Sequence, residues 1–226
     1  MTVRWPWLRR LVGLVADVPI RLVAAVLGAA IGLFVTFGTL QRVWYPYWNL
    51  ANLDSEASIA TLFSAAVLWA AALGWLLVAV SARPPSTSLW AWCVILAWLA
   101  LDEGNAFHEQ LERWSGIDWQ VLYLPVMAAG AAAWWGVVRR FRTQTRIVVL
   151  LVMSAASWAI ALTFELVQNW GGSPARSGIY VPTMIAEEAL EMIGSAMIII
   201  AAILALRCSI RAASLQGNET GAPVGE

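Results

Sequence analysis

Apolar residues of this chain gather in six long runs, and polar residues are confined mainly to the stretches between them. A helix needs about 20 predominantly apolar residues to cross a hydrocarbon core of about 30 Å. Each run is long enough for one crossing. The sequence therefore predicts an all-α, polytopic membrane helix bundle with six transmembrane helices, at residues 20–40, 58–80, 88–111, 119–138, 147–169 and 182–206.

The two ends of the chain follow different patterns. Before Pro19, arginines and one aspartate interrupt the apolar positions, which is typical of a short helix lying in the membrane interface. After Arg211 the chain is rich in Gly, Ser and Pro, which favours disorder. We therefore expect an interfacial amphipathic segment, a six-helix transmembrane domain and a disordered tail, at residues 1–19, 20–211 and 212–226.

Composition supports a membrane protein and excludes several kinds of active site. The chain is 61% hydrophobic and 12% charged, whereas soluble chains are about 45–50% apolar and about 25% charged. It contains no lysine, which excludes a lysine Schiff base with retinal or pyridoxal phosphate. A single histidine, His108, excludes a bis-His haem and multi-His iron sites, and two cysteines make no disulfide framework or thiolate zinc site.

Arginine predicts the orientation of the bundle. If the amino terminus is cytoplasmic, eleven of the 14 arginines fall on the inner side of the six predicted spans. The positive-inside rule then places both termini in the cytoplasm. No nucleic-acid partner is expected, and the first partner is the lipid bilayer.

Carboxylates have the opposite distribution, since eleven of the 14 lie toward the outer side. Counting about 1.5 Å per residue from the inner ends of their helices places Asp102, Glu165 and Glu191 roughly 20–27 Å across the membrane. Each intramembrane charge costs about 2.5 kcal/mol or more unless it is paired, protonated or bound to a cation. A functional cluster in the outer half of the membrane is therefore expected.

Helical spacing predicts that these groups converge. Glu187 and Glu191 are four residues apart on one face, and Glu188 flanks them. The stripe from Asp102 through Asn105 to Glu112 places carboxylates on a second helix, with His108 beside them. We expect a divalent metal site with Asp102, His108, Glu165, Glu187 and Glu191 as ligands, and with Glu188 and Glu109 as catalytic residues.

The ligand types allow several metals and several functions. One imidazole with carboxylates suits Zn, Mn or Fe, whereas carboxylates with an amide suit Ca or Mg. Metal-bound water at such a site is a nucleophile, which predicts a membrane-embedded metal-dependent hydrolase of a lipid-like substrate. Two alternatives remain open, a cation or proton carrier and an accessory subunit that docks a partner in a larger membrane complex. We assign no chemistry to the 15 tryptophans, which we expect to face lipid or the membrane interface.

Three segments resemble motifs of an uncharacterised family of bacterial six-helix membrane proteins, with a DE…HE segment, then a Glu, then EE…EM.G. They are LDEGNAFHEQLE (101–112), TFELVQNW (163–170) and AEEALEMIGSA (186–196). The resemblance covers residues 88–206 and implies a multi-pass protein of the bacterial cytoplasmic (inner) membrane, but it implies no activity. As candidate site residues it implies Asp102, Glu103, His108, Glu109, Glu165, Glu187, Glu188 and Glu191.

Overall fold

The computed structural model describes residues 6–44, 53, 58–169 and 179–219, and this part of the chain is helical, without a strand. The all-α prediction is therefore confirmed for the described residues. Apolar helices satisfy their own backbone hydrogen bonds, which suits them to a membrane. In chain order the helices are α1 (Pro6–Asp17), α2 (Ile20–Trp44), α3 (Ile59–Ser81), α4 (Thr87–Asn105), α5 (Phe107–Ser115), α6 (Trp119–Leu122), α7 (Leu124–Arg140), α8 (Thr145–Asn169) and α9 (Tyr180–Glu219).

Four helices in the described part of the chain, α2, α3, α8 and α9, are long and apolar enough to cross a membrane. Our prediction of six spans is therefore too high by this measure, because α4 and α7 do not qualify. The helix α7 has only 17 residues. The helix α4 contains three tryptophans and carries Asp102 and Glu103 near its end, which lowers its hydropathy. The structure supports a membrane protein with four candidate spans.

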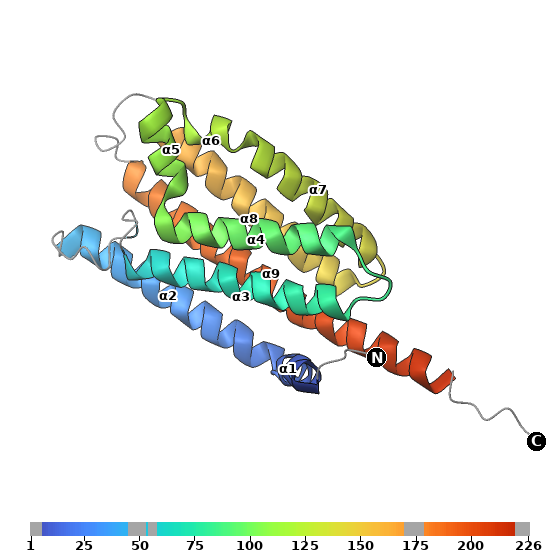
Figure 1. Cartoon of the computed structure of the whole chain (residues 1–226). Coiled ribbons are helices and arrows are strands. Elements are labelled where there is room, and N and C mark those ends of the chain that lie inside the picture. Colours follow the sequence, from blue (N-terminus) through green and yellow to red (C-terminus); the bar gives the residue numbers. More distant parts are fainter. Residues whose placement is uncertain (1–5, 45–52, 54–57, 170–178, 220–226) are drawn as a thin grey trace, which may run out of the picture.

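The long helices lie side by side along one common direction (Figure 1). The helix α9 packs against α2, α3 and α8, and α4 packs against α3 and α7. The α3–α4 and α7–α8 connections meet at one end, where Arg140 Nη2 donates hydrogen bonds to the carbonyl oxygens of Arg83 and Pro84. We call this the arginine end. The opposite end, the carboxylate end, holds Asp102, Glu103, Glu165, Glu187, Glu188 and Glu191.

A closely packed core lies toward the arginine end. Ala71 of α3 and Ala205 of α9 are fully buried there, together with Trp75 and Leu206. Small residues let helix backbones approach closely, which leaves room for a few large side chains between them. The Trp75 indole also donates a hydrogen bond to the carbonyl oxygen of Ile198 at 3.3 Å, so its polar atom is satisfied inside the core.

The helix predicted before the first span forms and is attached to α9. Val12 and Ala16 of α1 are buried in the core, whereas Trp7 is 59% exposed. Arg207 of α9 donates hydrogen bonds from Nε to the carbonyl oxygen of Ala16 at 2.6 Å and from Nη2 to that of Val18 at 2.7 Å. These carbonyls lie at the end of α1, where the helix leaves them without backbone partners.

The last helix is longer than the sequence pattern indicated. We expected the ordered part of the chain to end at residue 211, but α9 continues as helix to Glu219. Alanine, leucine and glutamine in this stretch are good helix formers. Residues 1–5 of the expected interfacial segment and residues 220–226 of the expected tail lie outside the described residues.

Candidate functional site

A cavity of about 750 Å³ lies among α3, α4, α7, α8 and α9 and includes the carboxylate end. Along α8 its lining runs from Ser154 to Gln168, and along α9 it runs from Ile198 to Tyr180. At about 1.5 Å per helical residue, these stretches are roughly 21 Å and 27 Å long. Carboxylates gather toward one end of the cavity, and mainly apolar side chains such as Leu96 line the rest. The cavity is therefore elongated and amphipathic.

The helix predicted over residues 88–111 is broken, and the break positions the site. The helix α4 ends at Asn105, Ala106 has a backbone φ of 50°, and α5 begins directly after it. A side chain in this left-handed conformation costs about 1–2 kcal/mol, a cost that glycine avoids. Because α5 does not continue α4, the predicted stripe from Asp102 to Glu112 does not form one helical face.

The break brings His108 back onto Asp102, which accepts three hydrogen bonds. Asp102 Oδ1 accepts the His108 backbone N–H at 2.9 Å and the Tyr123 hydroxyl at 2.7 Å, while Oδ2 lies 2.9 Å from His108 Nδ1. Asp102 and Tyr123 are both buried. Since a carboxylate oxygen accepts, we assign the proton to Nδ1, so the lone pair of the neutral ring lies on Nε2. The contacts fix both the orientation and the tautomer of His108.

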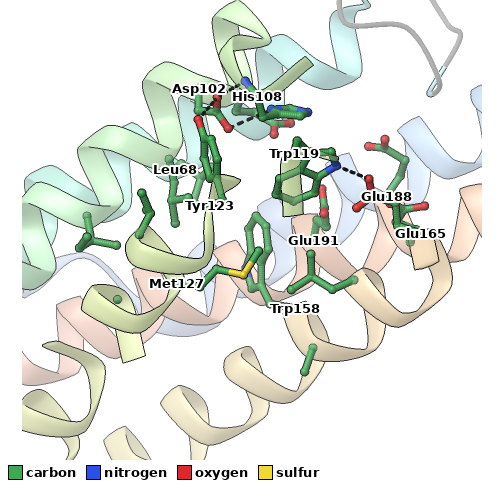
Figure 2. A pocket seen from close by; sticks show the side chains of 18 of the residues that line it. Leu68, Asp102, His108, Trp119, Tyr123, Met127, Trp158, Glu165, Glu188 and Glu191 are labelled. Carbon is green, nitrogen blue, oxygen red and sulfur yellow. Dashed lines mark hydrogen bonds and ion pairs between the residues drawn. The ribbon is translucent and has the colours of Figure 1, made fainter. Parts of the chain in front are cut away.

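Trp119 links this group to α8 (Figure 2). Its ring centroid lies 5.0 Å from that of His108 and 5.6 Å from that of Tyr123, and its Nε1 donates to Glu165 Oε1 at 2.6 Å. The Asp118 side chain caps α6, the short helix that carries Trp119. Trp119 begins α6 and Tyr123 directly follows it, four residues later, so the two rings lie on one side of this helical turn.

Carboxylates of α9 face the same space. Glu187 Oε2 accepts a hydrogen bond from Gln168 of α8. Glu191 lies one turn further along α9, and Figure 2 shows it below Trp119, on the side of the cavity that Glu165 and Glu188 also occupy. Four carboxylates are close enough to repel its charge, namely Glu103, Glu165, Glu187 and Glu188.

The structure thus brings the predicted site residues to one cavity, but it gives them different neighbours and different exposure. Glu188, predicted to be catalytic, lies on the cavity wall near Glu191. Glu109, the second predicted catalytic residue, forms an ion pair with Arg113 at 2.9 Å, and its side chain is partly exposed. The candidate residues that line the cavity are Asp102, Glu103, His108, Glu109, Glu165, Glu187, Glu188 and Glu191.

The predicted metal ligands do not form a coordination sphere. Within the described residues, no group of three or more His, Cys, Asp or Glu side chains is placed to hold a metal ion. Asp102, Glu165 and Glu187 instead accept hydrogen bonds from protein donors. These contacts use both oxygens of Asp102 but only one oxygen each of Glu165 and Glu187, so the metal site stays a prediction.

Trp119 and Tyr123 are site residues that the sequence analysis missed. We expected the tryptophans to face lipid or the interface, yet Trp119 is bonded to Glu165 inside the bundle. A local signal was present in DWQVLY (118–123), where a helix-capping aspartate precedes two aromatic residues four positions apart. The signal identifies a short helix with an aromatic side, but it does not say what that side contacts.

Comparison with other proteins gives a family but no activity. No curated protein and no solved structure matches this chain. A protein family described as "Domain of unknown function (DUF8692)" matches residues 15–207. This range contains every residue that lines the cavity. Because the match extends over most of the sequence, the chain belongs to the DUF8692 family.

Proposed function

We propose that this protein is a membrane-embedded hydrolase whose substrate is a lipid-like amphiphile. The observation that carries the proposal is the elongated cavity, polar at one end and apolar along the rest, with the His108–Asp102 pair at the polar end. Its volume of about 750 Å³ is in the range of small-molecule sites, about 300–1,000 Å³. An amphiphile matches this cavity, because its polar head group suits the polar end and its hydrocarbon chain suits the apolar part.

The apolar part of the cavity would hold the hydrocarbon chain. Leu96, Met127, Leu162 and Ile198 line it from four different helices. Methionine has an unbranched, polarizable side chain that adapts to irregular shapes, so this wall suits a flexible chain better than a rigid ring system.

The polar end would carry the chemistry, with His108 as general base. A water molecule gives a proton to Nε2 while its oxygen attacks the electrophilic centre of the substrate. The resulting imidazolium then returns the proton to the leaving group. Asp102 stabilises the imidazolium and Tyr123 holds Asp102, as their hydrogen bonds indicate. General acid–base catalysis of this kind contributes about 10²–10⁴-fold in rate.

A metal-dependent form of the same reaction is the second candidate, and the Asp102–His108 hydrogen bond favours it. Histidines that bind metals usually donate their other ring N–H to a carboxylate, as His108 does. A divalent ion bound by His108 and Glu191, after rearrangement of Glu165 or Glu187, would acidify the attacking water. Elemental analysis of protein purified without chelator tests this form directly.

We further propose that α4 and α7 cross the membrane together with the four apolar helices, with both termini in the cytoplasm. Both helices pack along long helices of the bundle, α4 against α3 and α7 against α4 and α8. The arginine distribution supports an orientation with the arginine end inside and the carboxylate end outside. In a bacterial inner membrane the site would then open toward the periplasmic face.

Turnover of defined amphiphiles by the purified protein in nanodiscs tests the function. Ester and amide classes are incubated with the wild type and with His108→Ala, and released products are quantified by mass spectrometry. We expect one class to be hydrolysed by the wild type and not by the variant, with both proteins unfolding at similar temperatures. Hydrolysis of no class would contradict the proposal and favour an accessory subunit or a cation carrier.

A further inference from the structure

The polar end of the cavity is rich in carboxylates. Eight carboxylates line the cavity, and no arginine among the described residues does. Glu109 is neutralised by Arg113, and Asp102 is held by His108 and Tyr123. Four of the eight carboxylates, Glu165, Glu187, Glu188 and Glu191, lie where α8 and α9 face each other.

Glu191 is a cavity carboxylate to which the described residues donate no hydrogen bond. It lies within the apolar span Tyr180–Ala212 and is half-buried. Among the described residues, no hydrogen bond or ion pair joins its side chain to another group, and its charged neighbours are all carboxylates. A carboxylate at membrane depth usually has a paired group or lines a ligand path. The side chain lines the cavity, so the missing positive charge is expected there.

We propose that the amphiphile bound in this cavity carries a protonated amine in its head group, with Glu191 as the principal counter-ion. The inference rests on the proposed function, because it names the substrate class for the same cavity. Trp119 and Trp158 also line this part of the cavity, and the face of an indole ring attracts an organic cation. A phosphate or carboxylate head group would instead be repelled by the glutamates.

The arrangement of the two polar groups gives this amine a role in positioning. Figure 2 shows the Asp102–His108–Tyr123 group on one side of Trp119 and Glu165, Glu188 and Glu191 on the other. An amine held by Glu191 therefore places the neighbouring part of the head group across Trp119, toward His108. The charge contact would fix which bond of the substrate faces the base, and in this way would exclude neutral and anionic lipids of similar length.

Binding of matched probes to the full-length protein tests the inference. A long-chain alkylammonium, an alkyl alcohol and an alkyl carboxylate of equal chain length are titrated into protein in nanodiscs of zwitterionic lipid, and affinity is measured by tryptophan fluorescence. We expect the alkylammonium to bind most tightly. Loss of one partner of a desolvated charge pair weakens binding by about 30-fold or more, and we expect this of Glu191→Gln. Alcohol binding should be unchanged in this variant.

Two further variants separate a specific contact from a general charge effect. Glu188→Gln removes a charge beside Glu191 and should weaken alkylammonium binding by a smaller factor. Asp17→Asn removes the same charge from an exposed position of α1, at the arginine end, and should have no effect. Unfolding temperatures without probe establish that each variant is folded.

The remaining outcomes separate the proposal of an amine head group from the proposal of an amphiphile-binding cavity. Equal wild-type affinities for the ammonium and the alcohol would overturn the proposal of an amine head group. The proposal of an amphiphile-binding cavity would still stand. Binding of none of the probes would overturn both the inference and the proposed function. If a divalent metal ion alone stabilises the wild type and excludes the alkylammonium, the carboxylates serve a metal and the amine is overturned.

Discussion

The arginine end and the carboxylate end of this bundle are built from the same helices but are packed in opposite ways. At the arginine end α3, α4, α8 and α9 meet through buried Ala71, Leu89, Ile147 and Leu206. Toward the carboxylate end these helices surround a cavity of about 750 Å³. One set of helices thus combines a rigid half with a half that has room for a ligand.

The side chains of α9 explain the difference. Its half at the arginine end presents Ala201 and Ala205 to the core, and both are fully buried. Small residues let neighbouring backbones approach and gain dispersion contacts. Its other half presents Glu187 and Glu191 to the cavity, where carboxylates of α4 and α8 also gather. These carboxylates line the cavity, whereas the alanines of the other half fill a packed core. The comparison predicts that equal substitutions will have unequal effects in the two halves.

The largest expected effect is on activity, at the carboxylate end. Asp102→Asn should lower the rate of hydrolysis by about 10²–10⁴-fold, because an amide presents only one oxygen acceptor to the donors of His108 and Tyr123 and the ring loses its fixed tautomer. Turnover in nanodiscs measures the effect, and Asp17→Asn at the arginine end is the matched control. Full turnover by Asp102→Asn would contradict the proposed role of His108 as general base.

The next effect is on stability and compares two leucines. Leu206→Ala leaves a void in the packed core and should lower the free energy of unfolding by about 2–4 kcal/mol. Leu162→Ala only enlarges an existing cavity, so a loss of less than about 1 kcal/mol is expected. Equilibrium unfolding in mixed micelles measures both. Equal losses would mean that the two ends are packed alike.

A larger side chain should lower stability in the packed core, but in the cavity it should weaken ligand binding. Ala201→Leu forces a larger side chain into the core and should cost about 1–3 kcal/mol of stability. Ala155→Leu extends into the cavity and should leave stability nearly unchanged while it weakens amphiphile binding. Unfolding measurements and probe titrations on the same two proteins provide the comparison. Unaltered probe affinity in Ala155→Leu would place the ligand elsewhere.

The smallest effect concerns the helix break beside the site. Ala106→Gly removes a left-handed side chain and should stabilise the protein by about 0.5–1 kcal/mol, whereas Ala106→Val, with a β-branched side chain, should destabilise it. Thermal unfolding in one detergent ranks the three proteins. A glycine variant less stable than the wild type would show that the alanine methyl group contributes more by packing than it costs in strain.

Much of the fold and part of the site could be predicted from the sequence. The run at 58–80 corresponds to α3 (Ile59–Ser81) and the run at 147–169 to α8 (Thr145–Asn169), because the length of an apolar run and the rise of a helix are local properties. The shared level of Asp102, Glu165 and Glu191 follows from the same rise per residue. These residues do line one cavity.

Other features were decided by contacts between distant segments. Alanine is the best helix former, so nothing local predicts that Ala106 breaks the helix; the contacts of Asp102 with His108 and Tyr123 accompany the break. Trp119 and Glu165 are 46 positions apart, and their hydrogen bond exists only in the packed bundle. Sequence spacing therefore determined which residues share a level, whereas tertiary packing decided which donors each carboxylate meets, because hydrogen bonds depend on direction as well as distance.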